Sequence, residues 1–220
     1  MDAAQPSFLN FHLHNKAEET NPVYARGTSV VLQQLLKDAE RRLTVFGFSD
    51  VTVKDPNSLI RRVREALPWG EVQVFDADAL AGKRHLVYAV ANALKAFEGG
   101  FNVSRSLSME TLVFASAQRQ ITAALSMMGV STRTANLLVA ALDLPSKLHS
   151  QAARSLAEVT GGERNDSILN EASPRKVRTL RRLFEVTNLE LDAAPLDRAP
   201  LIGRLEALII ERIAVSITGR

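Results

Sequence analysis

Three consecutive polar side chains, Gln118, Arg119 and Gln120, interrupt a mostly apolar stretch of the chain. One helical pattern ends just before them and a second begins just after, so they should lie at the start of a helix. The backbone N–H groups of a helix start have no partner within the helix and attract anions. A guanidinium and two amides at that point therefore predict an anion-binding site.

Two helices must position this SAQRQ junction, which comprises residues 116–120. The inward-facing residues of the first helix recur at helical spacing at Met109, Leu112, Val113 and Ser116. Those of the second helix are Ile121, Ala124, Leu125 and Met128. We expect Ser106 to cap the first helix, and Gly129 to end the second in a left-handed conformation.

Two further groups of cations accompany the junction in a chain whose net charge is +3. Lys83, Arg84 and His85 fall in the first turns of a helix that Asp78 is expected to cap. The helix dipole disfavours each cation there by about 0.3–1 kcal/mol. This triplet therefore indicates either a binding role or a solvated face. The densest basic run lies in a helix that begins at Ser173-Pro174, and its members are Arg175, Lys176, Arg178, Arg181 and Arg182.

The sequence contains none of the common catalytic motifs. It lacks a phosphate-binding P-loop, a G-x-G-x-x-G turn after a strand, a nucleophile elbow and an H-E-x-x-H pair. With no cysteine, disulfides and thiolate chemistry are excluded. Asp76 and Asp78 could serve as an acid/base pair, but Asp78 is explained as a helix cap. His12 and His14, with Glu18 and Glu19 nearby, could form a metal site, but the other two histidines are remote in sequence and a site normally needs three or four ligands. We therefore predict binding rather than catalysis, with no metal and no cofactor.

The order of the predicted elements gives the fold class. At 220 residues and 46% hydrophobic content the chain can bury one good core. Strands are expected over residues 44–53, with a bulge or bend at Gly47, and over residues 71–75 and 134–142. Helices are expected at residues 56–67, 79–98, 148–160, 174–184 and 200–213. Few strands among many helices predict an α+β domain, with a small mixed or antiparallel sheet of about four strands and helices layered around it.

The chain divides into an N-terminal extension, residues 1–42, and a single domain, residues 43–220. We expect the extension to be partly flexible, with a strand-like segment at residues 9–13 and one amphipathic helix over residues 28–42. Residues 192–199 are expected to be a linker. No apolar run reaches the ~20 residues that span a bilayer, and the N-terminus lacks the pattern of a secretory signal. A cytoplasmic protein is expected, also nuclear if the source is eukaryotic.

Two long runs of the sequence resemble a known family. They are VQVFDADALAGKRHLVYAVANALKAFEGG at residues 72–100 and NVSRSLSMETLVFASAQRQITAALSMMGVS at residues 102–131. The most specific pieces are DADALAGKRHL and the pattern S-x-S-x-E-x-L-x-x-A-S-x-x-R-Q-I. Together they resemble the small kinase-binding subunit of the KEOPS complex, the TPRKB family. The resemblance covers about residues 44–217, and residues 1–42 have no counterpart in it.

This resemblance implies a non-catalytic role in making threonylcarbamoyladenosine in tRNA. The family is an α+β domain that binds the small atypical kinase/ATPase of the complex directly, and the catalytic transferase subunit through that kinase. Its archaeal members hold the acceptor CCA tail of tRNA. A stand-alone RNA-binding or regulatory protein with the same fold is the alternative, and co-purification with a kinase-like protein distinguishes the two.

Residues and resemblance together indicate a tRNA site centred on Arg119, with Gln118 and Gln120. A CCA tail is single-stranded, so arginine can pair with its phosphates or stack on a base, and glutamine can bond to base edges. We assign further phosphate contacts to Lys83, Arg84 and Arg105. Alternatively, Arg119 forms a salt bridge to Glu110 or caps the preceding helix. No aromatic residue lies in the junction, so base stacking requires Arg119, His85 or a residue from elsewhere.

The remaining site predictions concern the tRNA body and the kinase. Arg175, Arg178 and Arg182 are expected to give a sequence-independent basic surface for tRNA, the alternative being a solvated helix face. Met127 and Met128 are expected to form an apolar patch for the kinase, because a flexible thioether can repack against another protein. The alternative is that both methionines fill the core.

Overall fold

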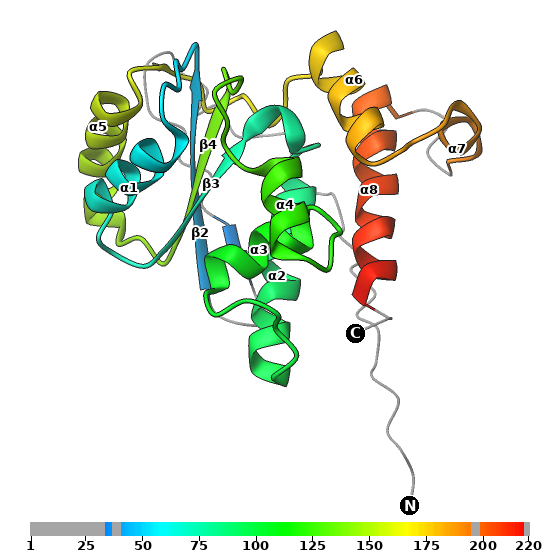
Figure 1. Cartoon of the computed structure of the whole chain (residues 1–220), viewed down its shortest axis with the longest axis horizontal. Coiled ribbons are helices and arrows are strands. Elements are labelled where there is room, and N and C mark those ends of the chain that lie inside the picture. The colour runs from blue at the N-terminus through cyan, green and yellow to red at the C-terminus, as the bar shows by residue number, and fades with distance from the viewer. Residues whose placement is uncertain (1–33, 37–40, 195–198, 218–220) are drawn as a thin grey trace, which may run out of the picture.

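The computed structural model describes residues 34–36, 41–194 and 199–217, which form a sheet covered by helices on both faces (Figure 1). The sheet order is β1-β2-β4-β3, and every pairing is antiparallel. A two-residue strand, β5, pairs with the end of β2. The strands are β1 (Gln34–Leu36), β2 (Arg41–Ser49), β3 (Glu71–Asp76), β4 (Leu137–Leu142) and β5 (Glu163–Arg164). The predicted α+β class with a small antiparallel sheet is confirmed.

The central strand, β4, is buried at all six of its residues, as its continuous apolar run predicts. Side chains alternate across the sheet, so Phe46 and Phe48 pack on one face with α1 (Pro56–Ala66) and α5 (His149–Thr160). Leu43 and Val45 pack on the other face. That face is covered by α2 (Lys83–Gly99), α3 (Leu107–Ala115) and α4 (Ile121–Met128).

A third group of helices lies beyond α2 and α4, on the side of the molecule away from α1 and α5 (Figure 1). It consists of α6 (Pro174–Leu183), α7 (Asn188–Ala193) and α8 (Leu201–Ile217), which share their own apolar cluster. None of the helices described is long and apolar enough to cross a membrane.

The helices α1, α3 and α6 each start at a side-chain cap. Asp55 caps α1 with Pro56 in its first turn, Ser106 caps α3, and Ser173 caps α6. The end of α4 differs in detail, because Gly129 is extended, with φ −71° and ψ 159°, rather than left-handed.

Three further local predictions are wrong. The helix expected over residues 28–42 is absent from its described part, where Gln34–Leu36 pair with Arg41–Leu43 as antiparallel strands, and sheet pairing overrides a modest helical pattern. Gly47 forms no bulge, since β2 keeps a regular register with β4 through it. The linker expected from residue 192 begins inside α7, whose Thr187 and Glu190 form a capping box.

Candidate functional site

The SAQRQ junction is a tight turn between α3 and α4. Ala117 is left-handed, with φ 53°, and the backbone N–H of Gln118 returns to the carbonyl oxygen of Val113 at 3.3 Å. Helix α4 then begins after Gln120, whose side chain makes no capping hydrogen bond. The side chain of Gln120 therefore leaves the backbone N–H groups at the start of α4 uncapped, as the predicted anion site requires.

The three polar side chains of the junction differ in exposure. The side chain of Gln118 is half-buried, with Nε2 3.4 Å from the Ser116 carbonyl oxygen and 3.8 Å from the Met127 sulfur. Arg119 and Gln120 are exposed. Arg119 makes no hydrogen bond or ion pair with any residue that the structure describes. The alternative salt bridge is not formed, because Glu110 is buried and accepts the backbone N–H groups of Val103 and Ser104.

The N-terminus of α2 carries Lys83 and Arg84 as exposed side chains. No acidic residue of α2 offsets them in the first turn. Instead, Glu206 of α8 accepts the backbone N–H of His85 at 3.0 Å. A Cβ at the capping residue, Gly82, would lie 2.5 Å from the same carboxylate. The Glu206 carboxylate therefore occupies the start of α2, so a ligand phosphate could meet Lys83 and Arg84 only through their exposed side chains.

His85 is fully buried and cannot stack on a base. Its Nδ1 accepts the Ala81 backbone N–H at 3.1 Å, and its Nε2 donates to the Ala115 carbonyl oxygen at 2.7 Å. The ring also packs edge-on against Phe184, with centroids 5.7 Å apart. Burial lowers the pKa of His85 to about 4. The residue is a structural bridge between α2, the end of α3 and the end of α6.

Asp78 does not cap α2, contrary to prediction. Asp76 instead accepts the Asp78 backbone N–H and the Thr134 hydroxyl, at 3.0 and 2.9 Å, and burial raises the pKa of Asp76. Asp78 is buried, accepts from the Asn136 amide at 3.0 Å and lies 3.2 Å from Nε of Arg175. Both carboxylates are therefore occupied by structural contacts.

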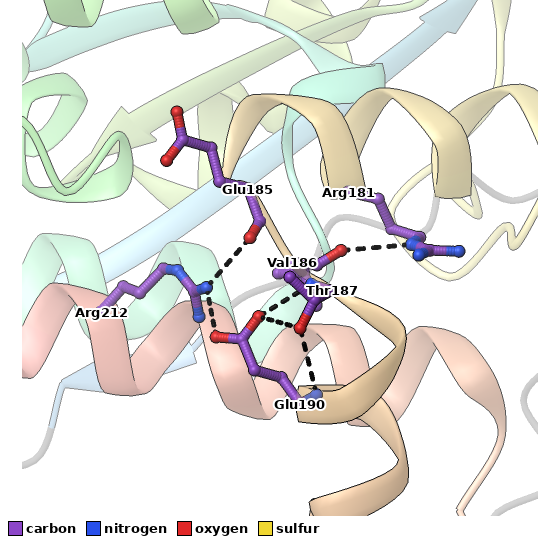
Figure 2. Close-up of polar contacts among 6 residues, drawn as sticks. All are labelled: Arg181, Glu185, Val186, Thr187, Glu190 and Arg212. Atoms are coloured by element: carbon purple, nitrogen blue, oxygen red, sulfur yellow. Dashed lines mark hydrogen bonds and ion pairs between the residues drawn. The ribbon is translucent and has the colours of Figure 1, made fainter.

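The five basic residues of α6 have different surroundings. Lys176 is buried and donates to the carbonyl oxygens of Ile168 and Leu169, and burial lowers its pKa to about 8. Arg181 donates to the Val186 carbonyl oxygen (Figure 2). It also donates to Oδ1 of Asn188. The exposed residues are Arg175, Arg178 and Arg182. At about 100° per residue they lie within roughly 60° of one another around the helix. They form one basic stripe, in which Arg175 is paired with Asp78.

Arg105 is separated from the other predicted phosphate contacts. It is exposed, but it precedes α3, whereas Arg119 follows α3. Nine helical residues span ~13 Å. His85 meets Ala115 at the C-terminal end of α3, so Lys83 and Arg84 lie near the Arg119 end.

The predicted methionine patch is wrong for Met128, which is fully buried in the core of α2, α3 and α4. Met127 is half-buried and packs against both the α2–α4 cluster and the α6–α8 cluster. Leu125, expected to face the core, is 40% exposed. The eight-residue helix α4 is anchored by Ala124 and Met128.

An open groove of about 640 Å³ runs from the junction to the last three helices. Sequence reasoning missed its far wall, because those residues come from segments remote in sequence. The pattern Thr187-x-x-Glu190 is a capping box, and it could have revealed α7. The lining residues are Ser116, Ala117, Gln118, Arg119, Met127, Leu183, Phe184, Glu185, Glu190, Glu211, Arg212, Val215 and Ser216.

No cluster that could hold a metal ion occurs in the described part of the chain. The His12/His14 pair and the strand-like segment at residues 9–13 lie outside that part.

Comparison with known proteins identifies the family. Residues 48–216 match the model of the kinase-binding protein CGI-121. The chain is also similar to the regulatory protein Cgi121 of Methanocaldococcus jannaschii, at 32% identity over 114 residues. That match covers 52% of this chain and 70% of the relative. The chain therefore belongs to the CGI-121 family of kinase-binding proteins, the KEOPS subunit family that its sequence resembles.

Proposed function

We propose that this chain is a non-catalytic subunit of the KEOPS complex that joins its atypical kinase/ATPase to tRNA during threonylcarbamoyladenosine formation. The kinase is the direct partner, the transferase subunit is reached through the kinase, and the cytoplasm is the compartment, with the nucleus added in a eukaryote. The kinase-binding family supports the first partner. One observation carries the tRNA proposal: Arg119 and Gln120 are exposed at an uncapped helix start, and Arg119 has no described partner.

The surroundings of Arg119 suit the end of a single strand. Lys83 and Arg84 lie on the N-terminus of α2, whose next residue bonds to the last residue of α3. Phosphates can pair with these cations, while Gln120 offers a donor and an acceptor to a base edge. Arg119 can pair or stack. Since His85 is buried, stacking on a base falls to Arg119 or to a residue from elsewhere.

Replacing Arg119 by glutamate should weaken binding of tRNA that carries its CCA end by about 1–3 kcal/mol. The fold should persist, because the Arg119 side chain is exposed and bonds to no described residue. Removing the CCA tail from the tRNA should have the same effect on the wild-type protein and no further effect on the variant. Titration with tailed and tailless tRNA measures both.

Arg154→Glu provides a matched control, because Arg154 is exposed on α5, across the sheet from the junction. It makes the same charge change far from the proposed site. Equal losses from the two variants, or wild-type affinity in Arg119→Glu, would remove Arg119 from the tRNA site.

The basic stripe on α6 should contribute a salt-dependent contact to the tRNA body. Replacing both Arg178 and Arg182 by glutamine should reduce the slope of log affinity against log salt by about 0.7–0.9 for each phosphate that the protein no longer neutralises. Arg175 is left in place because it pairs with the buried carboxylate of Asp78. Arg62→Gln with Arg64→Gln on α1 is the control, since both side chains are exposed on the other side of the sheet. A slope equal to that of the wild type would make the stripe an ordinary solvated face.

A further inference from the structure

The groove beside the SAQRQ junction combines an apolar lining with an acidic wall. Met127 and Leu183 line its inner part, and both pack against the cluster of α6, α7 and α8. Val215 of α8 also lines it and is 69% exposed, a high value for a large apolar side chain. An exposed apolar lining of this kind suits the side chains of a protein partner.

Two of the charged residues in the wall are bound to each other. Glu190 accepts the Thr187 backbone N–H at 2.7 Å and its hydroxyl at 2.9 Å, and it accepts from Arg212 at 2.7 Å (Figure 2). These hydrogen bonds, above all the one from the Thr187 backbone N–H, lower the pKa of Glu190 to about 2. Arg212 also reaches the Glu185 carbonyl oxygen at 3.4 Å. The guanidinium of Arg212 is therefore already bound to Glu190 and Glu185 of the same wall.

Two carboxylates of the wall remain available. Glu185 and Glu211 are exposed, and neither has a hydrogen bond or ion pair through its side chain with a residue in the described ranges. The backbone around Glu185 is held by Arg212 at its own carbonyl oxygen and by Arg181 at that of Val186. Figure 2 shows the Glu185 carboxylate pointing away from Arg212. A carboxylate on a fixed backbone is well placed to receive a cation from outside.

The charge balance of the groove opposes a phosphate chain. Three glutamates and two arginines line it, and Arg212 is already paired with Glu190. What remains is Arg119 at the junction end and the carboxylates of Glu185 and Glu211 at the other. An RNA strand that entered the groove would bring its phosphates towards these carboxylates, whereas a basic side chain would pair with them.

We propose that this groove docks a basic, amphipathic segment of the kinase partner, with apolar side chains on Met127, Leu183 and Val215 and cations on Glu185 and Glu211. This inference rests on kinase binding as the proposed function and assigns it a surface. An amphipathic helix presenting apolar anchors to a groove is a common mode of peptide recognition. RNA is then confined to the outer side of the junction, at Arg119, Gln120 and the start of α2.

Charge reversal distinguishes a protein occupant from RNA. Replacing the two carboxylates by cations should weaken binding of a basic protein segment, whereas it should strengthen binding of an RNA strand. The double variant Glu185→Lys, Glu211→Lys should bind the purified KEOPS kinase of the same organism at least tenfold more weakly than the wild type. Its affinity for tRNA should be unchanged or slightly increased. Both side chains are exposed, so the variant should fold, which circular dichroism checks. Glu98→Lys with Glu158→Lys makes the same charge change at exposed sites on α2 and α5, and should leave kinase affinity at the wild-type value.

Each other outcome overturns the proposal in an identifiable way. Wild-type kinase affinity together with much tighter tRNA binding would assign the groove to RNA. A changed sedimentation coefficient of the isolated chain would assign it to a second copy of this protein. Equal losses in the groove and control variants would reduce the effect to overall charge. If the wild-type protein bound neither kinase nor tRNA, the proposed function itself would fail, independently of the groove.

Discussion

Lowering the pH from 7 to 4 should reduce the free energy of unfolding by about 3 kcal/mol through His85 alone. The ring is fully buried, and its two nitrogens are committed to opposite roles. Nδ1 accepts the Ala81 N–H, so a proton on Nδ1 would place two donors against each other. Only the neutral tautomer with its proton on Nε2 satisfies both contacts.

The sign follows from the two pKa values. Burial lowers the folded-state pKa of His85 from 6.5 to about 4, so between these values the unfolded chain binds more protons than the folded chain. The contribution of His85 to the free energy of unfolding is fully present above pH 6.5. It falls as the pH drops from 6.5 to 4 and no longer changes below that range. The hydrogen bond to the Ala115 carbonyl oxygen raises the pKa of His85, and the charge of Lys176 lowers it, but burial has the larger effect. Glu206 bonds to the backbone N–H of His85.

Urea denaturation across this pH range, on wild type and His85→Gln, isolates the effect. Glutamine can donate to the Ala115 carbonyl oxygen without titrating, so the variant should be less stable at pH 7 but lose less stability on acidification. The raised pKa of Asp76 acts in the opposite direction in both proteins, and the difference between them removes it. Parallel pH profiles for the two proteins would show that His85 does not control acid stability.

His85 also illustrates which parts of the site a sequence can predict. Its position in a basic triplet suggested a surface role, which the structure shows for Lys83 and Arg84 but not for His85. Its burial depends on Ala115 and Phe184, which reach it from two other helices. Local pattern cannot supply such contacts. The junction at residues 116–120, by contrast, was predictable, since it follows from two adjacent helical stripes and a cap at Ser106.

Lys176 shows that periodicity sometimes contains more information than residue type. It lies four residues before Leu180 and eight before Phe184, so the helical stripe already placed it on the inward face of α6. Its charge suggested solvent. The structure buries its stem and satisfies the ammonium with the carbonyl oxygens of Ile168 and Leu169. The strand order and the groove could not be predicted, because both depend on contacts between distant segments.

Gly47→Ala should lower the free energy of unfolding by about 3 kcal/mol, from forced overpacking and a broken backbone hydrogen bond. A Cβ at Gly47 would lie 2.0 Å from the Asn165 carbonyl oxygen and 2.8 Å from Cγ2 of Ile168. The backbone at Asn165 must therefore move, although its N–H bonds to the Gly47 carbonyl oxygen at 2.9 Å. Chemical denaturation measures the loss. Gly203→Ala is the control, because its Cβ would meet only Ala199, at 3.8 Å within ordinary contact distance.

The movement of the Asn165 backbone that Gly47→Ala forces should extend to α6, the helix that carries the basic stripe. Asn165 leads directly to Ile168 and Leu169, whose carbonyl oxygens hold the ammonium of Lys176 on α6. Movement of this segment should weaken those two hydrogen bonds and increase hydrogen exchange of the α6 amides more than that of the α1 amides. Because Arg178 and Arg182 project from the same helix, the salt dependence of the proposed tRNA binding should decrease in the Gly47→Ala protein that remains folded. Wild-type stability and unchanged exchange in α6 would mean that this contact does not position the helix.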